Sequence, residues 1–275
     1  MTVEKFTIFG ANGFVGSHLV RHLINGGCKV NAFTRTKLPP RRGLNLGHVI
    51  YAIGITADFR RRFFDTVFAH VTQLAHILQN YQFESFLYLS STRLYRRAAN
   101  TQEDTEIRIS PSDPEQFYDA TKLAGEALCL TLPNHAARVA RLSNLYGAGN
   151  HADNFLSQVL LEATRNGHVI IQTAPRSAKD YLHVNDACLA LAKIAIGGRS
   201  RIYNVASGHN VTNAEIARLV ANGTKAEVSF APDGPEVIFP PIDVSLLASE
   251  ISWEPRMLVD KFPELLERSA VYEES

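Results

Sequence analysis

The sequence has few cysteines and no long apolar run. Its 275 residues include three cysteines, Cys28, Cys129 and Cys188, which lie far apart without disulfide-type or metal-type spacing. We therefore expect free thiols in a reducing compartment and no metal site. No apolar stretch approaches the roughly 20 residues that cross a bilayer. The N-terminal stretch MTVEKFTIFGANGF lacks the features of a signal peptide, so we expect a cytoplasmic protein without membrane contact.

The sequence also lacks an excess of charge of either sign. Lys and Arg number 28 and Asp and Glu 27, which gives a formal net charge of +1. Such a chain has no general basic field to hold nucleic acid or an anionic membrane. The one charged run, Arg60-Arg61-Arg62, is typical of a solvated loop or helix start, and contact with an anionic ligand is the alternative.

The first half alternates short β-type runs with amphipathic helical stretches. Strands are predicted at Phe6–Phe9, Lys29–Phe33, His48–Ala52, Phe86–Ser90 and Arg138–Leu142. Helices are predicted at Phe14–Asn25, Phe63–Asn80 and Gln116–Thr131. This alternation predicts an α/β fold with a parallel sheet that is covered by helices on both faces.

The second half is less regular. Helices that end at glycine are predicted within residues 153–167 and 185–198, and a strand within 201–206. A further helix within 212–223 has Thr212 placed to cap it. Prolines crowd residues 230–241, which indicates a loop-rich region.

A glycine-rich turn follows the first predicted strand. In TIFGANGFVGSHLV, Gly10, Gly13 and Gly16 have G-x-x-G-x-x-G spacing at the start of a helix. Such glycines allow a tight turn, close approach of the backbone to a pyrophosphate, and packing of helix on strand. The helix amides then face the phosphate charge. A plain strand–helix turn is the alternative, but the placement favours a dinucleotide site.

Six motifs in order resemble those of the extended short-chain dehydrogenase/reductase family, of the NAD-dependent epimerase/dehydratase type, which acts mainly on nucleotide-activated sugars. They are the glycine turn, YAIG (51–54), FLYLSSTRLY (86–95), YDATKLAGE (118–126), RLSNLYGAGN (141–150) and KDYLHVNDAC (179–188). The resemblance implies a Rossmann-type doubly wound parallel sheet with a small C-terminal lobe. It implies an NAD(P)-binding domain of residues 1–146 and 178–206, and a substrate-binding lobe of residues 147–177 and 207–275.

The resemblance implies that Ser91, Tyr118 and Lys122 are catalytic. Tyr118 and Lys122, four apart, share one helix face, although most such pairs have no function. The tyrosine would be the acid/base of a hydroxyl–carbonyl interconversion. A lysine ammonium and an oxidised nicotinamide ring would lower its pKa from about 10. Ser91 would orient the reacting oxygen.

The same resemblance assigns residues to ligands. Predicted cofactor contacts are Gly10, Asn12, Gly13, Phe14, Val15, Gly16, Thr34, Arg35, Ala52, Tyr118 and Lys122. Predicted substrate contacts are Thr92, Asn144, Asn154, Phe155 and Lys179. Asn144 could instead be a turn former, and His183 is more typical of a loop tether than of a catalyst.

The cofactor is predicted to be NADP rather than NAD. NAD-specific relatives carry an acidic residue at the end of the second strand, where this chain has Thr34 and then Arg35, with Arg41 and Arg42 close behind. These side chains can bind a 2′-phosphate through charge-assisted hydrogen bonds. If Arg35 only stacks on adenine, either cofactor is acceptable.

Three departures from the family pattern limit the reaction. A helix, a strand and an adenine-contacting aspartate are missing after the second strand, so the sheet should have six strands, one fewer than is usual. The segment APDGPEVIFPPIDVSLL has no arginine to hold a substrate diphosphate. Thr92 and Arg93 follow Ser91 where dehydratases carry Asp-Glu, so water elimination lacks its catalysts.

The leading interpretation is an NAD(P)-dependent oxidoreductase that reduces a keto group of a nucleotide-linked deoxysugar, with the proton coming from Tyr118. A sugar epimerase that retains NAD is the second interpretation. The third is a catalytically silent protein that senses a dinucleotide, since fold alone does not define function; the complete set of Ser91, Tyr118 and Lys122 argues against it. The sequence names neither sugar nor nucleotide, and it leaves open whether the chain forms a homodimer.

Overall fold

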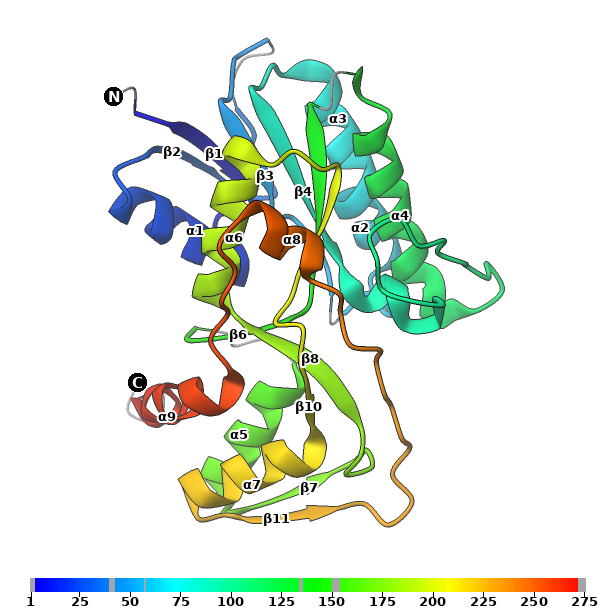
Figure 1. The fold of residues 1–275 in the computed structure, drawn as a ribbon, viewed down its shortest axis with the longest axis vertical. Helices are drawn as coiled ribbons and strands as arrows, with labels where there is room; N and C mark the ends of the chain where they lie inside the picture. Colours follow the sequence, from blue (N-terminus) through cyan, green and yellow to red (C-terminus); the bar gives the residue numbers. More distant parts are fainter. Residues whose placement is uncertain (1–2, 40–42, 57, 134–135, 150–153, 272–275) are drawn as a thin grey trace.

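A six-stranded parallel sheet forms the centre of the larger region of the molecule (Figure 1). The structure is a computed structural model that describes residues 3–39, 43–56, 58–133, 136–149 and 154–271. The strands lie in the order β2 (Lys29–Phe33), β1 (Lys5–Phe9), β3 (His48–Tyr51), β4 (Ser85–Ser91), β5 (Ala137–Leu142) and β9 (Ile202–Val205). All neighbouring pairs are parallel. The predicted doubly wound α/β fold and its six strands are confirmed.

Helices cover both faces of this sheet, as the alternation of elements predicts. Helices α1 (Phe14–Asn25) and α6 (Val184–Gly197) pack on one face. The other face carries α2 (Phe63–Val67), the π-helical turn η1 (Phe68–Thr72), α3 (Gln73–Asn80) and α4 (Phe117–Leu130). Strand side chains alternate between the two cores: in β3, Ile50 joins the first core, and Val49 and Tyr51 join the second.

The predicted regular helix over Phe63–Asn80 is wrong in its middle, where η1 separates α2 from α3. Two tyrosine hydroxyls from the sheet donate to backbone carbonyl groups of this turn, Tyr51 to Ala69 at 2.6 Å and Tyr88 to His70 at 3.5 Å. Side chains that insert into the helical hydrogen-bond ladder favour such irregular turns, which occur often at functional sites. The amphipathic pattern of the sequence cannot reveal partners from distant strands.

A second region lies past the ends of the strands of the large sheet and has its own core (Figure 1). Its sheets consist of β10 (Asn210–Thr212), β8 (Ala178–His183) and β6 (Asn144–Tyr146), and of β11 (Glu227–Phe230) and β7 (His168–Ile171). Its helices are α5 (Phe155–Asn166), α7 (Asn213–Thr224) and α9 (Leu258–Val271), while α8 (Ser245–Glu250) packs near β9. The assignment of this region as a substrate-binding lobe stays a prediction.

The helices predicted in the second half form. Helix α5 ends at Gly167 in the left-handed conformation, with a φ of 68°. Helix α7 begins with a capping box in which Thr212 and Glu215 satisfy each other's backbone amides. No helix among the described residues is both long and apolar enough to span a membrane.

Candidate active site

The predicted cofactor and catalytic residues meet at the carboxyl ends of the parallel strands. The glycine turn follows β1, the loop of residues 52–56 follows β3, and Ser91 ends β4. Tyr118 lies in the first turn of α4, which packs beside β4 and β5. Ligands of doubly wound folds bind at this edge of the sheet.

The glycine turn fits a dinucleotide pyrophosphate. Gly10 has a φ of +86°, and a Cβ atom there would lie 2.8 Å from the backbone of Ala52. A Cβ atom at Gly16 would overlap the carbonyl oxygen of Gly10. Helix α1 begins after Gly13. As in any helix, its first amides have no partner within the helix, and here no side chain at Gly13 caps them. Backbone and anion can therefore approach closely at this helix N-terminus.

The end of β2 holds the predicted contacts to the adenosine half of the cofactor. The amide groups of Gly10 and Ala11 donate to the carbonyl oxygen of Phe33 at 2.8 and 3.0 Å, which ties the glycine turn to this strand end. The carbonyl group of Arg35 accepts a hydrogen bond from Gln73 at 2.6 Å. Its guanidinium finds no partner in the part of the chain that the structure describes. Arg41 and Arg42 lie outside the described residues.

Tyr118 is buried, with 4% of its surface exposed. Hydrogen bonding from the hydroxyl groups of Ser91 and Thr56 acts on its phenol and lowers its pKa. Burial raises the pKa of Tyr118 to about 12, and the two hydroxyl groups oppose this shift because they stabilise the phenolate. The rings of Phe59 and His70 each lie 5.4 Å from the Tyr118 ring and exclude water from it.

Lys122 lies one helical turn after Tyr118 and is also buried. Its ammonium group donates to the carbonyl oxygen of Leu89 at 2.9 Å and lies 5.9 Å from the centre of the Tyr118 ring. Burial lowers the pKa of Lys122 to about 7, while the carboxylate of Glu126 opposes the shift. Ser91, Tyr118 and Lys122 thus come together as the resemblance implies.

The predicted substrate residues divide into two groups. Lys179 and Phe155 are brought together, since the amine lies 5.7 Å from the centre of that ring. Thr92, Asn144 and Asn154 make structural hydrogen bonds instead. Thr92 donates to the carbonyl of Leu142 at 3.3 Å, Asn144 donates to that of Asp180 at 2.9 Å, and Asn154 caps α5 by accepting from the Ser157 amide at 2.9 Å. Their contact with substrate stays a prediction.

His183 acts as a tether here. Its imidazole caps α6 by accepting a hydrogen bond from the amide of Asn185 at 3.3 Å. Burial lowers the pKa of His183 to about 4, so that the ring is neutral and able to accept.

Sequence reasoning missed the site roles of Thr56 and His70 and saw Arg93 only as a departure from a motif. The Nε atom of Arg93 donates to Asp119 at 3.1 Å, and its guanidinium carbon lies 5.7 Å from the centre of the Tyr118 ring. Thr56 follows the YAIG motif but has no pattern of its own. His70 is a single histidine in a helical stretch, a signal that carries no function by itself.

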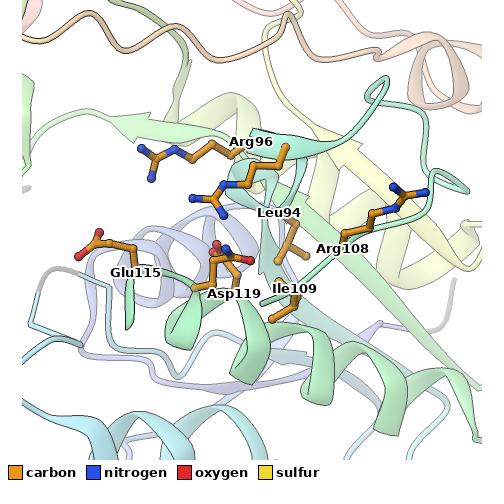
Figure 2. Close-up of a pocket in the computed structure, with 8 residues that line it drawn as sticks. Leu94, Arg96, Arg108, Ile109, Glu115 and Asp119 are labelled. Atoms are coloured by element: carbon orange, nitrogen blue, oxygen red, sulfur yellow. The ribbon is translucent and has the colours of Figure 1, made fainter. Parts of the chain in front are cut away.

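A small pocket opens beside the short helix η2 (Thr92–Arg97), next to α4 (Figure 2). Its lining residues are Leu94, Arg96, Arg97, Arg108, Ile109, Glu115, Gln116 and Asp119. Arg97 pairs with Asp113 at 2.8 Å. The Arg60–Arg62 run contributes surface ion pairs, Arg60 to Glu115 and Arg62 to Asp65, as expected of a solvated helix start.

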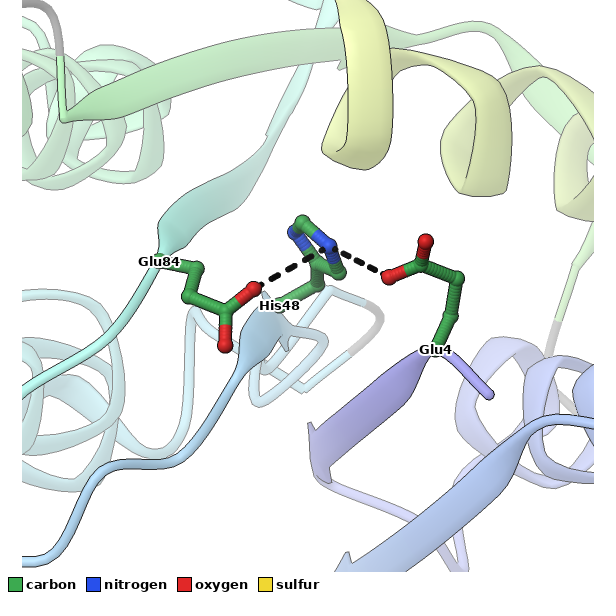
Figure 3. Close-up of side chains that lie close together, drawn as sticks. All are labelled: Glu4, His48 and Glu84. Atoms are coloured by element: carbon green, nitrogen blue, oxygen red, sulfur yellow. Dashed lines mark hydrogen bonds and ion pairs between the residues drawn. The ribbon is translucent and has the colours of Figure 1, made fainter. Parts of the chain in front are cut away.

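A second titratable cluster lies at the amino ends of the strands, away from Tyr118 and Lys122 (Figure 3). The Nε2 atom of His48 lies 3.1 Å from Glu4 and 3.7 Å from Glu84. Its Nδ1 atom lies 2.9 Å from the hydroxyl group of Ser85, which donates to the carbonyl of Ala195. The contacts of His48 with Glu4, Glu84 and Ser85 account for this cluster, and we assign no metal to it.

The chain is similar in sequence to a known family and to several of its members. A model of the NAD dependent epimerase/dehydratase family matches residues 37–206. A dTDP-glucose 4,6-dehydratase from Streptomyces niveus is 25% identical over 218 residues, which cover 76% of this chain and 63% of that protein. The chain therefore spans less than two thirds of that relative. A dTDP-4-dehydro-6-deoxy-D-allose reductase from Streptomyces bikiniensis is 24% identical over 311 residues, which cover 94% of this chain and 95% of that protein.

A solved structure, MoeE5 in complex with UDP-glucose and NAD, has the same fold. Its TM-score is 0.79 with 23% sequence identity, and the match covers 98% of this chain and 100% of that one. At this level of identity, the likeness concerns the fold alone.

Proposed function

This chain belongs to the NAD dependent epimerase/dehydratase family, and from that premise we propose that it reduces a keto group of a nucleotide-linked sugar with NADPH. The observation that carries the proposal is the buried phenol of Tyr118, whose pKa is lowered by hydrogen bonding from Ser91 and which lies one helical turn from Lys122. The cofactor, when bound in the glycine turn beside these residues, supplies the hydride. The chain itself supplies the proton and the orientation.

Tyr118 has the protonation state that a reduction requires. With a pKa raised to about 12 by burial, its phenol is protonated near neutral pH and can donate to the substrate oxygen. Ser91 can hydrogen-bond the same oxygen and fix its position. After the proton leaves, the positive charge of Lys122 stabilises the phenolate.

Arg93 favours reduction over elimination of water. A dehydratase needs an acid and a base after its catalytic serine or threonine, whereas here the hydroxyl of Thr92 is bonded to Leu142 and Arg93 carries a permanent positive charge. A permanent cation cannot serve as a base. The reductase from Streptomyces bikiniensis, similar over most of its length, is consistent with this choice.

Lys179 supports an anionic substrate. Its amine is half-buried between the rings of Phe155 and Phe239, 5.7 and 5.9 Å away. Burial lowers the pKa of Lys179, and the positive charges of Arg93 and Arg96 lower it further. Neighbouring cations repel one another, so an anion between them is stabilised. We propose that these residues face the diphosphate of the nucleotide sugar in place of the missing lobe arginine.

An NAD-retaining epimerase is the second candidate, because Tyr118, beside Ser91 and Lys122, could take the proton of a sugar hydroxyl while its carbon gives hydride to NAD, and return the proton when the hydride comes back to the other face of that carbon. The similar fold of MoeE5, solved with UDP-glucose and NAD, is the observation in its favour. The two candidates differ in whether cofactor is consumed.

The test is to mix the purified protein with NADPH and a panel of nucleotide-linked 4-keto-6-deoxysugars, and to follow the nicotinamide absorbance. Consumption of NADPH together with a reduced sugar product supports the reductase. Inversion of a nucleotide sugar at one carbon without added cofactor would replace it with the epimerase. If neither reaction occurs and the protein binds only the dinucleotide, the sensing role is supported instead.

The preference for NADPH predicts an effect of Arg35. Because a hydrogen bond to a charged group contributes about 1.5–3 kcal/mol, Arg35→Ala should raise the KM for NADPH by about tenfold or more and leave that for NADH nearly unchanged. Steady-state kinetics with each cofactor measures both constants. Arg62→Ala, which removes a partly exposed guanidinium that pairs with Asp65, is the matched control. Equal loss with both cofactors would point to stacking on adenine.

A further inference from the structure

His70 connects the loop after β3 to the catalytic helix. It lies in η1 and has no exposed surface. The amide of Ile55 donates to its Nε2 atom at 3.2 Å, and its Nδ1 atom lies 2.9 Å from the hydroxyl group of Thr121. Its ring meets that of Tyr118 edge-on, with an angle of 84°.

The direction of these hydrogen bonds defines the tautomer. A backbone amide can only donate, so Nε2 of a neutral His70 must lack a proton and Nδ1 must carry it. Nδ1 therefore donates to Thr121, whose own hydroxyl donates to the carbonyl oxygen of Tyr118 at 2.8 Å. Burial and the nearby charge of Lys122 lower the pKa of His70 to about 2, which keeps the ring neutral.

Close packing holds the imidazole in this position. A Cβ atom at Gly125 would collide with the Tyr88 hydroxyl and lie 2.8 Å from the carbonyl oxygen of His70, so glycine lets α4 approach η1. A Cβ atom at Gly54 would lie 3.5 Å from both the Nε2 atom of His70 and the Nζ atom of Lys122. The loop after β3 therefore runs directly over these two side chains.

This loop reaches both halves of the site. At its start, Ala52 lies against Gly10 of the glycine turn. At its end, hydrogen bonding from the Thr56 hydroxyl lowers the pKa of Tyr118. Ile55, which His70 holds, precedes Thr56 directly. A shift of the Ile55 amide would therefore displace the Thr56 hydroxyl from the phenol.

We propose that His70 is a positioning residue, which as a neutral imidazole holds the loop of residues 52–56 against α4 and so places the Thr56 hydroxyl on the Tyr118 phenol. It touches no reacting atom and acts through Ile55 and Thr56. The inference rests on the proposed role of Tyr118 as the proton donor. A residue that only fills the core needs the right size and shape. The positioning role of His70 also requires a hydrogen-bond acceptor at the place of its Nε2 atom.

Two substitutions separate these roles. In His70→Gln the side-chain oxygen can replace Nε2 as the acceptor for Ile55, whereas in His70→Asn the shorter amide can replace only the donor to Thr121. His70→Asn should lower kcat by about tenfold with little change in the KM for the sugar, and His70→Gln by less than about threefold. His76→Asn in the following helix α3, a side chain outside these contacts, is the matched control and should match the wild type.

The pH dependence of kcat distinguishes the two roles, because the loss of a residue that only fills the core would not shift it. The Thr56 hydrogen bond lowers the pKa of Tyr118, so its loss in His70→Asn should raise that pKa and move the alkaline decline of kcat to higher pH. His70→Gln should leave the decline in place. The titratable and charged groups that face Tyr118 are Lys122, Asp119, Arg93, His70 and Tyr88.

A double-variant cycle tests the route through Thr56. If His70 acts through this hydroxyl, Thr56→Val combined with His70→Asn should be no slower than the slower single variant. Multiplied losses would overturn the route. Equal kinetics of the Asn and Gln variants, or an unshifted pH profile in both, would overturn the positioning role.

Hydrogen exchange of the Ile55 amide tests the anchor without turnover. Exchange should accelerate by about tenfold or more in His70→Asn and stay near the wild-type rate in His70→Gln, with melting temperatures as the folding control. If the wild type reduces no keto sugar, the proposed function fails, and this exchange measurement still decides whether His70 holds the loop. Unchanged exchange in His70→Asn would refute the anchor.

Discussion

Tyr118→Phe should lower kcat by about 10²-fold or more, the usual scale for a catalytic acid, while folding and cofactor binding persist. The substitution removes only the hydroxyl, on which hydrogen bonding from Ser91 and Thr56 acts. The ring keeps its contacts with Phe59 and His70. Turnover would be followed by nicotinamide absorbance, and binding by the fluorescence of bound NADPH.

Tyr81→Phe is the matched control for this loss. Tyr81 is also buried and donates to the carbonyl of Pro39 at 3.0 Å, outside the catalytic residues. Its substitution should leave kcat unchanged within about twofold, since no reacting group is touched. Near wild-type turnover of Tyr118→Phe would refute the assignment of Tyr118 as the proton donor and, with it, the dependent role of His70.

Glu126→Leu should destabilise the fold by about 3–5 kcal/mol, because it leaves the guanidinium of Arg141 buried without its carboxylate. The two side chains, 3% and 4% exposed, form paired hydrogen bonds of 3.0 and 2.7 Å between α4 and β5. Arg141 also donates to the Tyr95 hydroxyl at 2.7 Å, so its position is fixed from two sides. Urea unfolding followed by circular dichroism measures the free energy of unfolding.

Two further variants make this prediction specific. Glu106→Ala breaks an ion pair with Arg108 whose side chains are 75% and 79% exposed, and it should cost less than about 1 kcal/mol. Glu126→Leu combined with Arg141→Met removes both charges and should be more stable than Glu126→Leu alone. A single variant as stable as the wild type would contradict a structural role of the buried pair. The carboxylate also raises the pKa of Lys122, so its loss reaches the catalytic residues.

The sequence by itself determined the features that depend on local spacing. The five strands predicted in the first half form within one residue of their expected bounds, and α1 forms over Phe14–Asn25 as predicted. The alternation of apolar residues and the spacing of Gly10 and Gly16 are properties of a short stretch of chain. They can be recognised without knowing which other segments pack against it. A tyrosine and a lysine four apart must share a helix face, so Tyr118 and Lys122 could be paired without coordinates.

Only the tertiary structure decided the features that depend on partners from distant segments. The π-helical turn at His70 forms where Tyr51 and Tyr88 of the sheet donate to its backbone. Strands of three or four residues, such as β6 and β10, are too short to show a period and exist because β8 lies between them.

The same dependence on distant partners decided which polar side chains remain available to a ligand. Thr92, Asn144 and Asn154 are each committed to a hydrogen bond within the protein. Lys179 instead lies among aromatic rings and other cations. Thr56 reaches Tyr118 because the buried ring of His70 holds the preceding residue. A hydrogen bond between residues far apart in the chain leaves no periodic trace in the sequence, since its energy depends on geometry that the whole fold creates.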